Sequence, residues 1–310
     1  MTSKVTVERL ASNQKVSSMP LMESSLATLL FPSNVYHSTS RSYNWSLSTE
    51  ENFRSQESQV FYGKFKHIRQ RLDYKYHAHY SGTRQLMQDG IIESLLLTGY
   101  EFLDSAKEHT EQVRHFIIFT AGCMGAGKTH TIRELSSNGK FPVKAFISVD
   151  PDEIRRLLPE YSSYIAENAE TAGELTRKEA GMIAEILTEA ALEKGRNVLV
   201  DGSLRDAAWY KNYFEHLRQS YPKLSLGIVH VTAPVEDIHV RVQQRAKSTG
   251  RIIPSNVLEE CMEQVPRSVS LLRDHVDLFL DHTRGCGMGC GLRCLLRRHI
   301  AVGVRGCALS

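Results

Sequence analysis

The sequence predicts an α/β protein in which helices cover both faces of a five-stranded parallel sheet, giving three layers, with a helical extension in front. Two patterns predict this fold. From residue 113 onward, apolar runs of strand length alternate with segments of helical periodicity, which is typical of a parallel sheet with crossover helices. The first apolar run also leads directly into a glycine-rich turn and a helix start. One strand–turn–helix unit can therefore be recognised in full.

The elements of this predicted domain, residues 113–283, follow one another in regular order. Strands are expected at residues 115–121, 144–149, 197–201, 226–232 and 276–281. Helices are expected at residues 128–135, 153–158, 174–193, 207–220 and 235–247. No internal repeat is present, so the alternation predicts a single domain.

Two segments are predicted in front of this domain: a flexible leader over residues 1–48 and a helical extension over residues 49–112. The leader has twelve serines, two prolines and no sustained periodicity. Ser48 and Glu51 form a capping box, so order is expected to begin there. Apolar residues then recur at helical spacing and predict one helix, at Phe53, Val60, Phe61, Phe65, Ile68 and Leu72. A second helix is expected over residues 83–97.

Composition and charge exclude several classes of protein. The chain has 310 residues, of which 41% are hydrophobic and 24% are charged, close to the globular norm. Its net charge of +3 comes from the last 29 residues, which hold five arginines and no acid, so the remainder carries −2. That charge does not favour nucleic acid as a partner.

No apolar run is long enough to span a membrane. Isolated cysteines in the body favour a reduced, cytoplasmic protein, with organelle import by the serine-rich leader as the alternative.

A phosphate-binding loop is the strongest signal in the sequence. The run Gly122-Cys123-Met124-Gly125-Ala126-Gly127-Lys128-Thr129 matches G-x-x-x-x-G-K-T between a predicted strand and a predicted helix. In such a loop the backbone amides surround the phosphates, Lys128 reaches the β and γ phosphates, and the Thr129 hydroxyl can hold Mg²⁺. The cofactors expected are ATP, or GTP, and Mg²⁺. Cys123 is expected to fill space rather than to react.

Acidic residues follow two of the predicted strands. Asp150 and Asp152 come where the second strand meets a helix, and Asp201 ends the third strand, followed by Ser203 and Arg205. Ligands bind at the carboxyl edge of a parallel sheet. Asp152 could cap the helix or accept the proton of an incoming hydroxyl, and Asp201 could orient water or substrate or simply end a turn.

Basic residues cluster near the end of the predicted helix at 235–247. Arg245 and Arg251 flank a Ser-Thr-Gly break, in a stretch that also holds Arg241 and Lys247. Such a stretch can form a lid whose guanidinium groups stabilise the phosphoryl group during transfer. Solvated helix charges are the alternative interpretation.

These motifs together resemble the zeta toxin family of P-loop kinases over residues 114–281. The order G-C-M-G-A-G-K-T, V-D-P-D-E-I-R-R-L-L-P-E-Y, V-D-G-S-L-R and R-A-K-S-T-G-R-I-I-P carries the resemblance. It implies a P-loop NTPase fold of the kinase type. Bacterial members phosphorylate a sugar hydroxyl of UDP-N-acetylglucosamine with ATP or GTP and Mg²⁺.

The resemblance also implies roles for individual residues. Lys128 and Thr129 would bind the nucleotide and metal, and Asp152 would be the general base. The residues implied on the substrate and phosphate sides are Arg155, Glu185, Arg245 and Arg251. Three departures leave the acceptor open: this chain has Asp201-Gly202-Ser203 where the bacterial motif reads Glu-Gly-Thr, the arginine segment is shorter, and the helical extension is its own.

The sequence therefore predicts a kinase that transfers the γ-phosphoryl group of ATP to a hydroxyl of a small metabolite. A UDP-sugar such as UDP-N-acetylglucosamine is one candidate acceptor, and a protein partner is left open. The alternatives are a polynucleotide 5′-hydroxyl kinase, or a non-catalytic module that binds partners in response to nucleotide.

Residues 284–310 are predicted to form a disordered tail rich in cysteine and arginine. The spacing of Cys286, Cys290, Cys294 and Cys307 is not a standard zinc pattern. Zinc binding and palmitoylation beside the arginines are the less favoured alternatives. Metal binding by the H-x-H pair of His77 and His79 is likewise disfavoured, because no third ligand is near in sequence.

Overall fold

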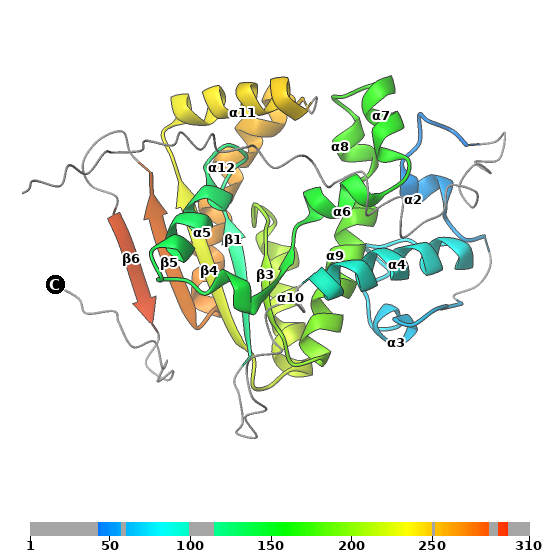
Figure 1. Ribbon diagram of the computed structural model, residues 1–310, viewed down its shortest axis with the longest axis horizontal. Helices are drawn as coiled ribbons and strands as arrows, with labels where there is room; N and C mark the ends of the chain where they lie inside the picture. Colours follow the sequence, from blue (N-terminus) through cyan, green and yellow to red (C-terminus); the bar gives the residue numbers. More distant parts are fainter. Residues whose placement is uncertain (1–42, 57–59, 99–114, 250–251, 285–290, 297–310) are drawn as a thin grey trace, which may run out of the picture. The chain divides into compact units, whose positions relative to one another are not determined.

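The computed structural model describes residues 43–56, 60–98, 115–249, 252–284 and 291–296. A six-stranded sheet lies at the centre of this part of the chain (Figure 1). Its strands are β1 (Phe116–Ala121), β2 (Phe146–Val149), β3 (Asn197–Val200), β4 (Ser225–Thr232), β5 (Leu278–Thr283) and β6 (Gly291–Leu296). The order across the sheet is β2-β3-β1-β4-β5-β6, with the first five strands parallel and β6 antiparallel to β5. The predicted five-stranded parallel sheet is confirmed.

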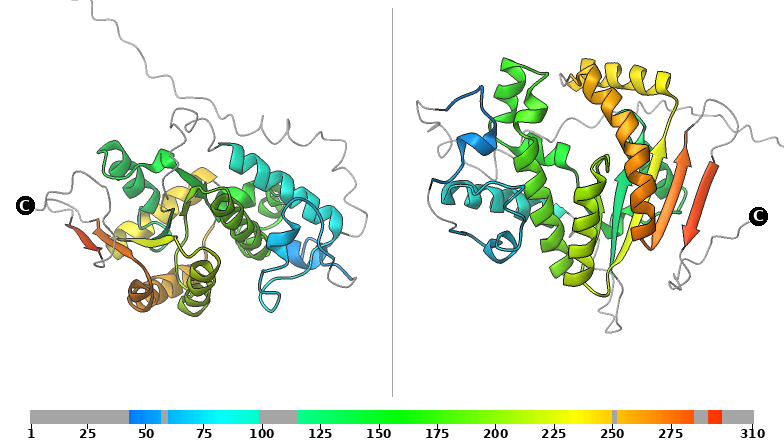
Figure 2. Two further views of the ribbon diagram at one scale, coloured as in Figure 1. Left: turned by 90° about the horizontal axis from the view of Figure 1, so that it is seen from below. Right: turned by 180° about the vertical axis from the view of Figure 1, so that it is seen from behind.

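Helices connect the parallel strands and cover both faces of the sheet. Their bounds are α5 (Lys128–Ser137), α6 (Pro151–Leu157), α7 (Tyr161–Glu167), α8 (Ala172–Leu175), α9 (Arg177–Glu193), α10 (Ala207–Ser220), α11 (Val235–Thr249) and α12 (Ser255–Leu272). Figure 1 shows α5 in front of the sheet, and the view from behind in Figure 2 shows α10 and α12 in front of it. The three-layer prediction is therefore confirmed.

The pleat of β1 divides the core between these two faces. Ile118 points to the α5 side, where it packs in a buried cluster with Ile132 and Leu135 of that helix. Phe119, the next residue, points to the other side, and its ring lies 4.9 Å from that of Phe214 in α10. Burying both faces of the strand explains why its sequence is a continuous apolar run rather than an alternating one.

Helix α12 was not predicted. Its buried residues recur at helical spacing, at Leu258, Cys261, Val265, Val269 and Leu272. Pro266 interrupts the polar side of this pattern, and a proline ordinarily argues against a helix interior. The helix continues through Pro266 because packing of its apolar face against the rest of the fold stabilises it more than the proline destabilises it.

The extension contains α2 (Thr49–Asn52), α3 (Lys66–Arg69) and α4 (Gly82–Thr98). The capping box at Ser48 and the second predicted helix are both present. The single long helix predicted from Phe53 to Leu72 is wrong. Arg54 instead forms an isolated antiparallel bridge with Tyr80, and Gly63 turns the chain with φ of 79°.

Buried ion pairs join α4 to the helices that follow β2. The Arg84 guanidinium donates two hydrogen bonds to Glu160 and two to Glu179, at 2.7–2.9 Å. Gln88 of α4 donates to the same Glu179 carboxylate at 2.8 Å. All of these side chains are buried, so each carboxylate in the group has the Arg84 cation as its partner and Glu179 also accepts from Gln88. The extension is therefore an integral part of the fold.

Two predicted boundaries differ from the structure. Residues 43–48, assigned to the leader, pack against α7: Tyr164 donates to the Leu47 carbonyl oxygen at 2.6 Å, and its hydroxyl lies 2.7 Å from that of Tyr43. Residues 291–296, assigned to the disordered tail, form β6. This strand forms by pairing with the outer side of β5, because an edge strand offers a row of backbone donors and acceptors to a further strand. The leader residues 1–42 and the rest of the tail beyond Arg284 lie outside the described residues.

Within the described ranges, no helix is both long enough and apolar enough to cross a bilayer.

Candidate active site

The loop between β1 and α5 has the conformation that a phosphate-binding loop requires. Gly122, Gly125 and Gly127 have φ values of 146°, 85° and 95°, which side chains rarely adopt. A Cβ atom would lie 2.4 Å from the Val231 carbonyl oxygen at Gly122, and 2.8 Å from that of Ile238 at Gly125. Neighbouring backbone thus closes around the loop from β4 and from α11. Only glycine fits the first two positions without displacing that backbone.

Lys128 and Thr129 begin helix α5 directly after this loop. The Lys128 ammonium group donates to the carbonyl oxygens of Gly122 at 2.9 Å and Cys123 at 3.4 Å, so it lies across the loop. The helix start, the glycine loop and one lysine are the groups that bind nucleotide phosphates elsewhere, and the Thr129 hydroxyl is a suitable oxygen ligand for Mg²⁺. The residues present therefore fit a nucleoside triphosphate with Mg²⁺.

The end of β3 is fixed against this loop by hydrogen bonds. Thr120 of β1 donates to the Asp201 carboxylate at 2.6 Å and accepts from the Gly202 amide at 3.1 Å. The Gly122 amide donates to the Ser203 carbonyl oxygen at 3.2 Å. The strand-end acid and the phosphate loop consequently share one hydrogen-bonded frame.

Asp150, rather than Asp152, caps helix α6. Its carboxylate accepts from the Asp152 amide at 2.7 Å, and Pro151 occupies the first turn. The pKa of Asp150 is raised to about 6, mainly by burial and then by the neighbouring Asp201 and Asp152 carboxylates, against the lowering effect of the cap bond. Side-chain capping of α6 therefore does not account for Asp152.

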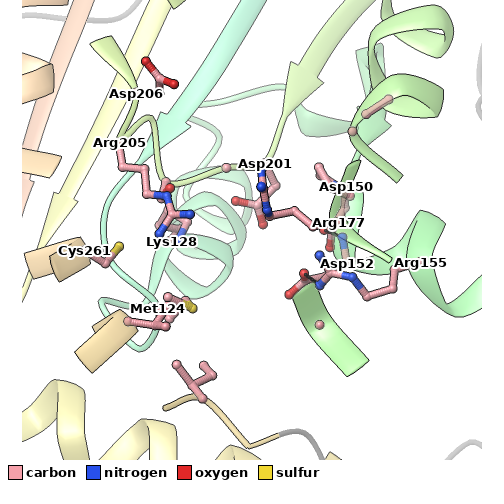
Figure 3. Close-up of a pocket in the computed structure, with 18 of the residues that line it drawn as sticks. Met124, Lys128, Asp150, Asp152, Arg155, Arg177, Asp201, Arg205, Asp206 and Cys261 are labelled. Atoms are coloured by element: carbon pink, nitrogen blue, oxygen red, sulfur yellow. Dashed lines mark hydrogen bonds and ion pairs between the residues drawn. The ribbon is translucent and has the colours of Figure 1, made fainter. Parts of the chain in front are cut away.

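The Asp152 carboxylate meets two arginines at the edge of the sheet. Arg155, one turn along α6, donates to it at 2.6 Å, and Arg245 of α11 donates at 3.3 Å. Figure 3 shows Asp150, Asp152 and Asp201 around one hollow, with Lys128 on its other side. The structure thus brings together the predicted base, the predicted phosphate loop and one of the two predicted lid arginines. Arg251, the other, lies outside the described residues.

Glu185 of α9 contacts a residue of the extension. Its carboxylate lies 2.8 Å from Nε2 of His77, and both side chains are buried. His79 turns elsewhere and stacks on Tyr74, with ring centroids 3.9 Å apart. The part of the chain with described coordinates contains no cluster of three or more His, Cys, Asp or Glu residues arranged to hold a metal ion.

Lys128, Asp152 and Glu185 line one cavity of about 1240 Å³ together with the arginines that contact Asp152. The predicted residues on its wall are Met124, Gly125, Gly127, Lys128, Thr129, Asp150, Asp152, Arg155, Glu185, Asp201, Ser203, Arg205 and Arg245. The sequence analysis missed Arg177, Tyr76 and Trp209, which also line it. No local sequence pattern distinguishes these three residues from ordinary surface residues. Arg177 is the first residue of α9. Figure 3 shows Arg177 on the same side of the hollow as Asp150 and Asp152.

Helix α11 connects the phosphate loop with the acidic edge. Arg241 donates to the Gly125 carbonyl oxygen at 3.3 Å and is held by Asp237 at 2.9 Å. One helical turn further on, Arg245 reaches Asp152. A single helix therefore contacts both the loop and the predicted base.

The thiol of Cys123 in the loop interacts with the thiol of Cys261 in α12, and both cysteines are free. The hydrogen bond between the two buried thiols lowers the pKa of Cys261 and raises that of Cys123. The charge of Lys128 lowers the pKa of both. Cys123 thus packs inward between the loop and α12, and it does not line the cavity.

Comparisons with known proteins agree with this geometry. A solved structure from the PezAT chromosomal toxin–antitoxin system of Streptococcus pneumoniae superposes with a TM-score of 0.50 at 18% identity, over 66% of this chain and 78% of that chain. A structure of AvrRxo1-ORF1:-ORF2 with ATP also gives 0.50, at 14% identity, over 80% of this chain and 76% of that chain. These similarities support the fold. No curated protein sequence matches. The family model described as zeta toxin matches residues 100–284, more than half of the chain, and the protein therefore belongs to the zeta toxin family.

Proposed function

We propose that the protein is an ATP-dependent kinase that transfers the γ-phosphoryl group to a hydroxyl of a small metabolite. A nucleotide sugar such as UDP-N-acetylglucosamine is the acceptor to test first. One observation carries the proposal: a single cavity contains both the phosphate loop with Lys128 and the Asp152 carboxylate with its two arginines. A site that only bound a nucleotide would not need Asp152 and its two arginines.

On the donor side, the chain's own groups would bind and orient the triphosphate. The amides of the glycine loop and the start of α5 would face the phosphate oxygens. Lys128 would exchange its two carbonyl partners for the β and γ phosphates, and Thr129 would hold Mg²⁺. The metal, when bound, neutralises charge that develops on the phosphate oxygens.

On the acceptor side, Asp152 would accept the proton of the attacking hydroxyl. As the acceptor oxygen bonds to the γ phosphorus, the bond to the leaving oxygen of ADP breaks and the proton passes to the carboxylate. Because the transition state of phosphoryl transfer is loose, orientation of the hydroxyl contributes as much as basicity does. Arg245, which bonds Asp152 in this structure, would stabilise the charge of the transferring group.

The remaining predicted residues would bind the acceptor. Glu185, Asp201 and Ser203 offer oxygen atoms to hydroxyl groups, and Arg155 and Arg205 offer guanidinium groups to phosphate. The assignment of each residue to the acceptor rests on its position in the cavity and on the family resemblance.

The test is ³¹P NMR of the purified full chain with Mg²⁺-ATP, alone and with a panel of UDP-sugars. A new phosphomonoester signal with one sugar, absent in Lys128→Ala, is the expected result. ADP without any phosphorylated product would contradict the proposed acceptor class. Transfer to the 5′ end of an oligonucleotide in a parallel sample would show a polynucleotide kinase instead.

A further inference from the structure

The extension reaches into the cavity. Tyr76 and His77 lie between α3 and α4, upstream of the residues that the family model matches, yet both line the cavity beside Glu185 and Trp209. The Arg84 ion pairs fix α4 and the preceding chain to α9, the helix that carries Glu185. This part of the wall therefore lies outside the range of the family match and is bonded to α9 through Arg84.

The His77 side chain is buried, and a buried imidazole needs hydrogen-bond partners for its ring nitrogens. It is 2% exposed, and its Nε2 atom lies 2.8 Å from Glu185, whose side chain is 9% exposed. The other ring nitrogen, Nδ1, is buried and has no hydrogen-bond partner among the described residues. A buried polar group without a partner is costly unless a ligand supplies the partner. The contact through Nε2 thus orients Glu185.

Tyr76 and Trp209 form an aromatic surface next to this pair. Their ring centroids are 6.0 Å apart and the planes are inclined by 41°. Both side chains are only partly buried, so ring surface remains open on the cavity side. The Lys178 ammonium lies 5.7 Å from the Tyr76 ring, and Arg177 donates to the Tyr76 hydroxyl at 3.4 Å.

These groups together suit one class of ligand. Aromatic faces bind planar or sugar rings, a carboxylate accepts hydrogen bonds from hydroxyl groups, and nearby cations bind phosphate. A molecule with all three features is a nucleotide or nucleotide sugar.

We propose that the extension completes the acceptor pocket: Tyr76 forms with Trp209 the surface on which the acceptor ring packs, and His77 positions Glu185 for the acceptor hydroxyls. Tyr76 is a binding residue and His77 is a positioning residue. The inference rests on the proposed kinase function, because it assumes that this cavity holds the acceptor.

A matched control exists in a second contact between the extension and α9. His67 of α3 contacts Glu193 of α9 through the same atoms and at the same distance, 2.8 Å. That pair lies outside the cavity, and His67 is 50% exposed. His67→Leu removes a histidine–glutamate contact between the extension and α9 without touching the pocket.

The first experiment measures binding through Trp209. The chain has two tryptophans, so a Trp45→Phe background leaves Trp209 as the only one. The protein is saturated with a non-hydrolysable ATP analogue and Mg²⁺, then titrated with UDP-N-acetylglucosamine, UDP and AMP. We expect a change in Trp209 emission with at least one probe, and a tenfold or greater loss of affinity in Tyr76→Ala and His77→Leu. His77→Gln, which keeps a donor near Nε2, should remain within threefold of the parent, as should His67→Leu.

The second experiment separates positioning from general damage. In phosphoryl transfer to the probe that binds, His77→Leu should raise the KM for the acceptor at least tenfold while the KM for ATP stays within twofold. His77→Gln should restore the acceptor KM. Thermal unfolding of each variant checks that it is folded, and a variant that is not folded is replaced by Tyr76→Leu or His77→Asn.

The outcomes distinguish the two proposals. Probe binding without any phosphorylated product contradicts the kinase function and leaves the pocket assignment standing. Transfer with wild-type acceptor KM in both Tyr76→Ala and His77→Leu overturns the pocket assignment and leaves the kinase function standing. If no probe changes the Trp209 emission, the aromatic surface is not a nucleotide-binding surface and the inference is wrong.

Discussion

Asp150 caps helix α6 in an environment that disfavours the charged form of its carboxylate. The carboxylate accepts a hydrogen bond from the Asp152 amide, while burial and the nearby Asp201 and Asp152 side chains disfavour its ionised form. Its folded pKa of about 6 lies above the reference value of 3.8. A raised carboxyl pKa means that the folded state holds its proton longer than the unfolded state does, so the associated stability is present at low pH and is lost as pH rises through about 6.

We therefore predict that Asp150→Asn changes the pH dependence of stability. Asparagine keeps the cap because it is an equally good N-cap residue. Without nucleotide and Mg²⁺, the free energy of unfolding of the wild type should fall relative to the variant between about pH 4 and pH 6, by about 3 kcal/mol. Urea unfolding of both proteins across this range measures the difference. Parallel curves would show that Asp150 is not perturbed.

Asp152 differs from Asp150 in having arginine partners and no capping role. If it is the general base, Asp152→Asn should retain ATP affinity and lose about 10²- to 10⁴-fold in kcat for phosphoryl transfer. Calorimetry with ATP and product formation by ³¹P NMR measure the two quantities. Glu153→Gln, which changes the adjacent acid outside the cavity, is the control. Near-normal turnover of Asp152→Asn would remove Asp152 as base.

At the scale of elements, one arginine supplies the ion pairs between α4 and the helices that follow β2. Arg84 is the shared cation of Glu160 and Glu179 in a buried group, and its guanidinium lies 3.8 Å from the Phe53 ring centroid. Removing one partner of a buried ion pair leaves an uncompensated charge, which is much more costly than removing the whole group.

Arg84→Met should therefore lower the free energy of unfolding by about 3–5 kcal/mol. The triple variant with Glu160→Gln and Glu179→Gln should recover part of this loss, because no charge then remains buried alone. Arg267→Met is the control: its ion pair with Glu263 is exposed and should contribute within about 0.5 kcal/mol. Urea unfolding at one pH compares the four proteins, and an Arg84→Met loss no larger than that of the control would contradict the argument.

Elements with strong local signals were predictable from the sequence. The Ser48 capping box, the glycine loop before Lys128 and the helix over residues 207–220 all follow from residues close to one another in the chain. The long helix predicted after Phe53 failed because its apolar spacing reflects packing against other parts of the chain. Strand β6 has no such local signal, since its pairing depends on the open edge of β5.

The candidate site divides in the same way. Lys128, Asp152 and Arg245 were identifiable because they sit in short motifs, and the structure brings all three to one cavity. The contact of His77 with Glu185 joins residues 108 positions apart, so no local pattern could reveal it. Short motifs therefore identified the candidate residues of the site, whereas the rest of the cavity wall required the tertiary structure.

For the whole molecule, the buried contacts predict cooperative unfolding of the extension with the family domain. Trp45 packs against Tyr164 with ring centroids 5.4 Å apart, and Trp209 lies in α10. The two tryptophans therefore report on different parts of the described chain. Denaturation of Trp45→Phe and Trp209→Phe, followed by fluorescence, should give transitions whose shapes coincide with the far-ultraviolet circular dichroism of the same protein. An earlier fluorescence transition in Trp209→Phe would show that the N-terminal part unfolds separately.

The Arg84 ion pairs also bear on how this protein can be divided or recombined. The family match begins at residue 100, but the carboxylates of Glu160 and Glu179 find their cation in α4, before that point. A fragment cut at the family boundary would leave Glu160 and Glu179 without their cation and would uncover the surface that α4 buries. The range of the family match is consequently smaller than the unit of folding, and a swap of the matched range between relatives would succeed only if the segment from Tyr43 to Thr98 moved with it.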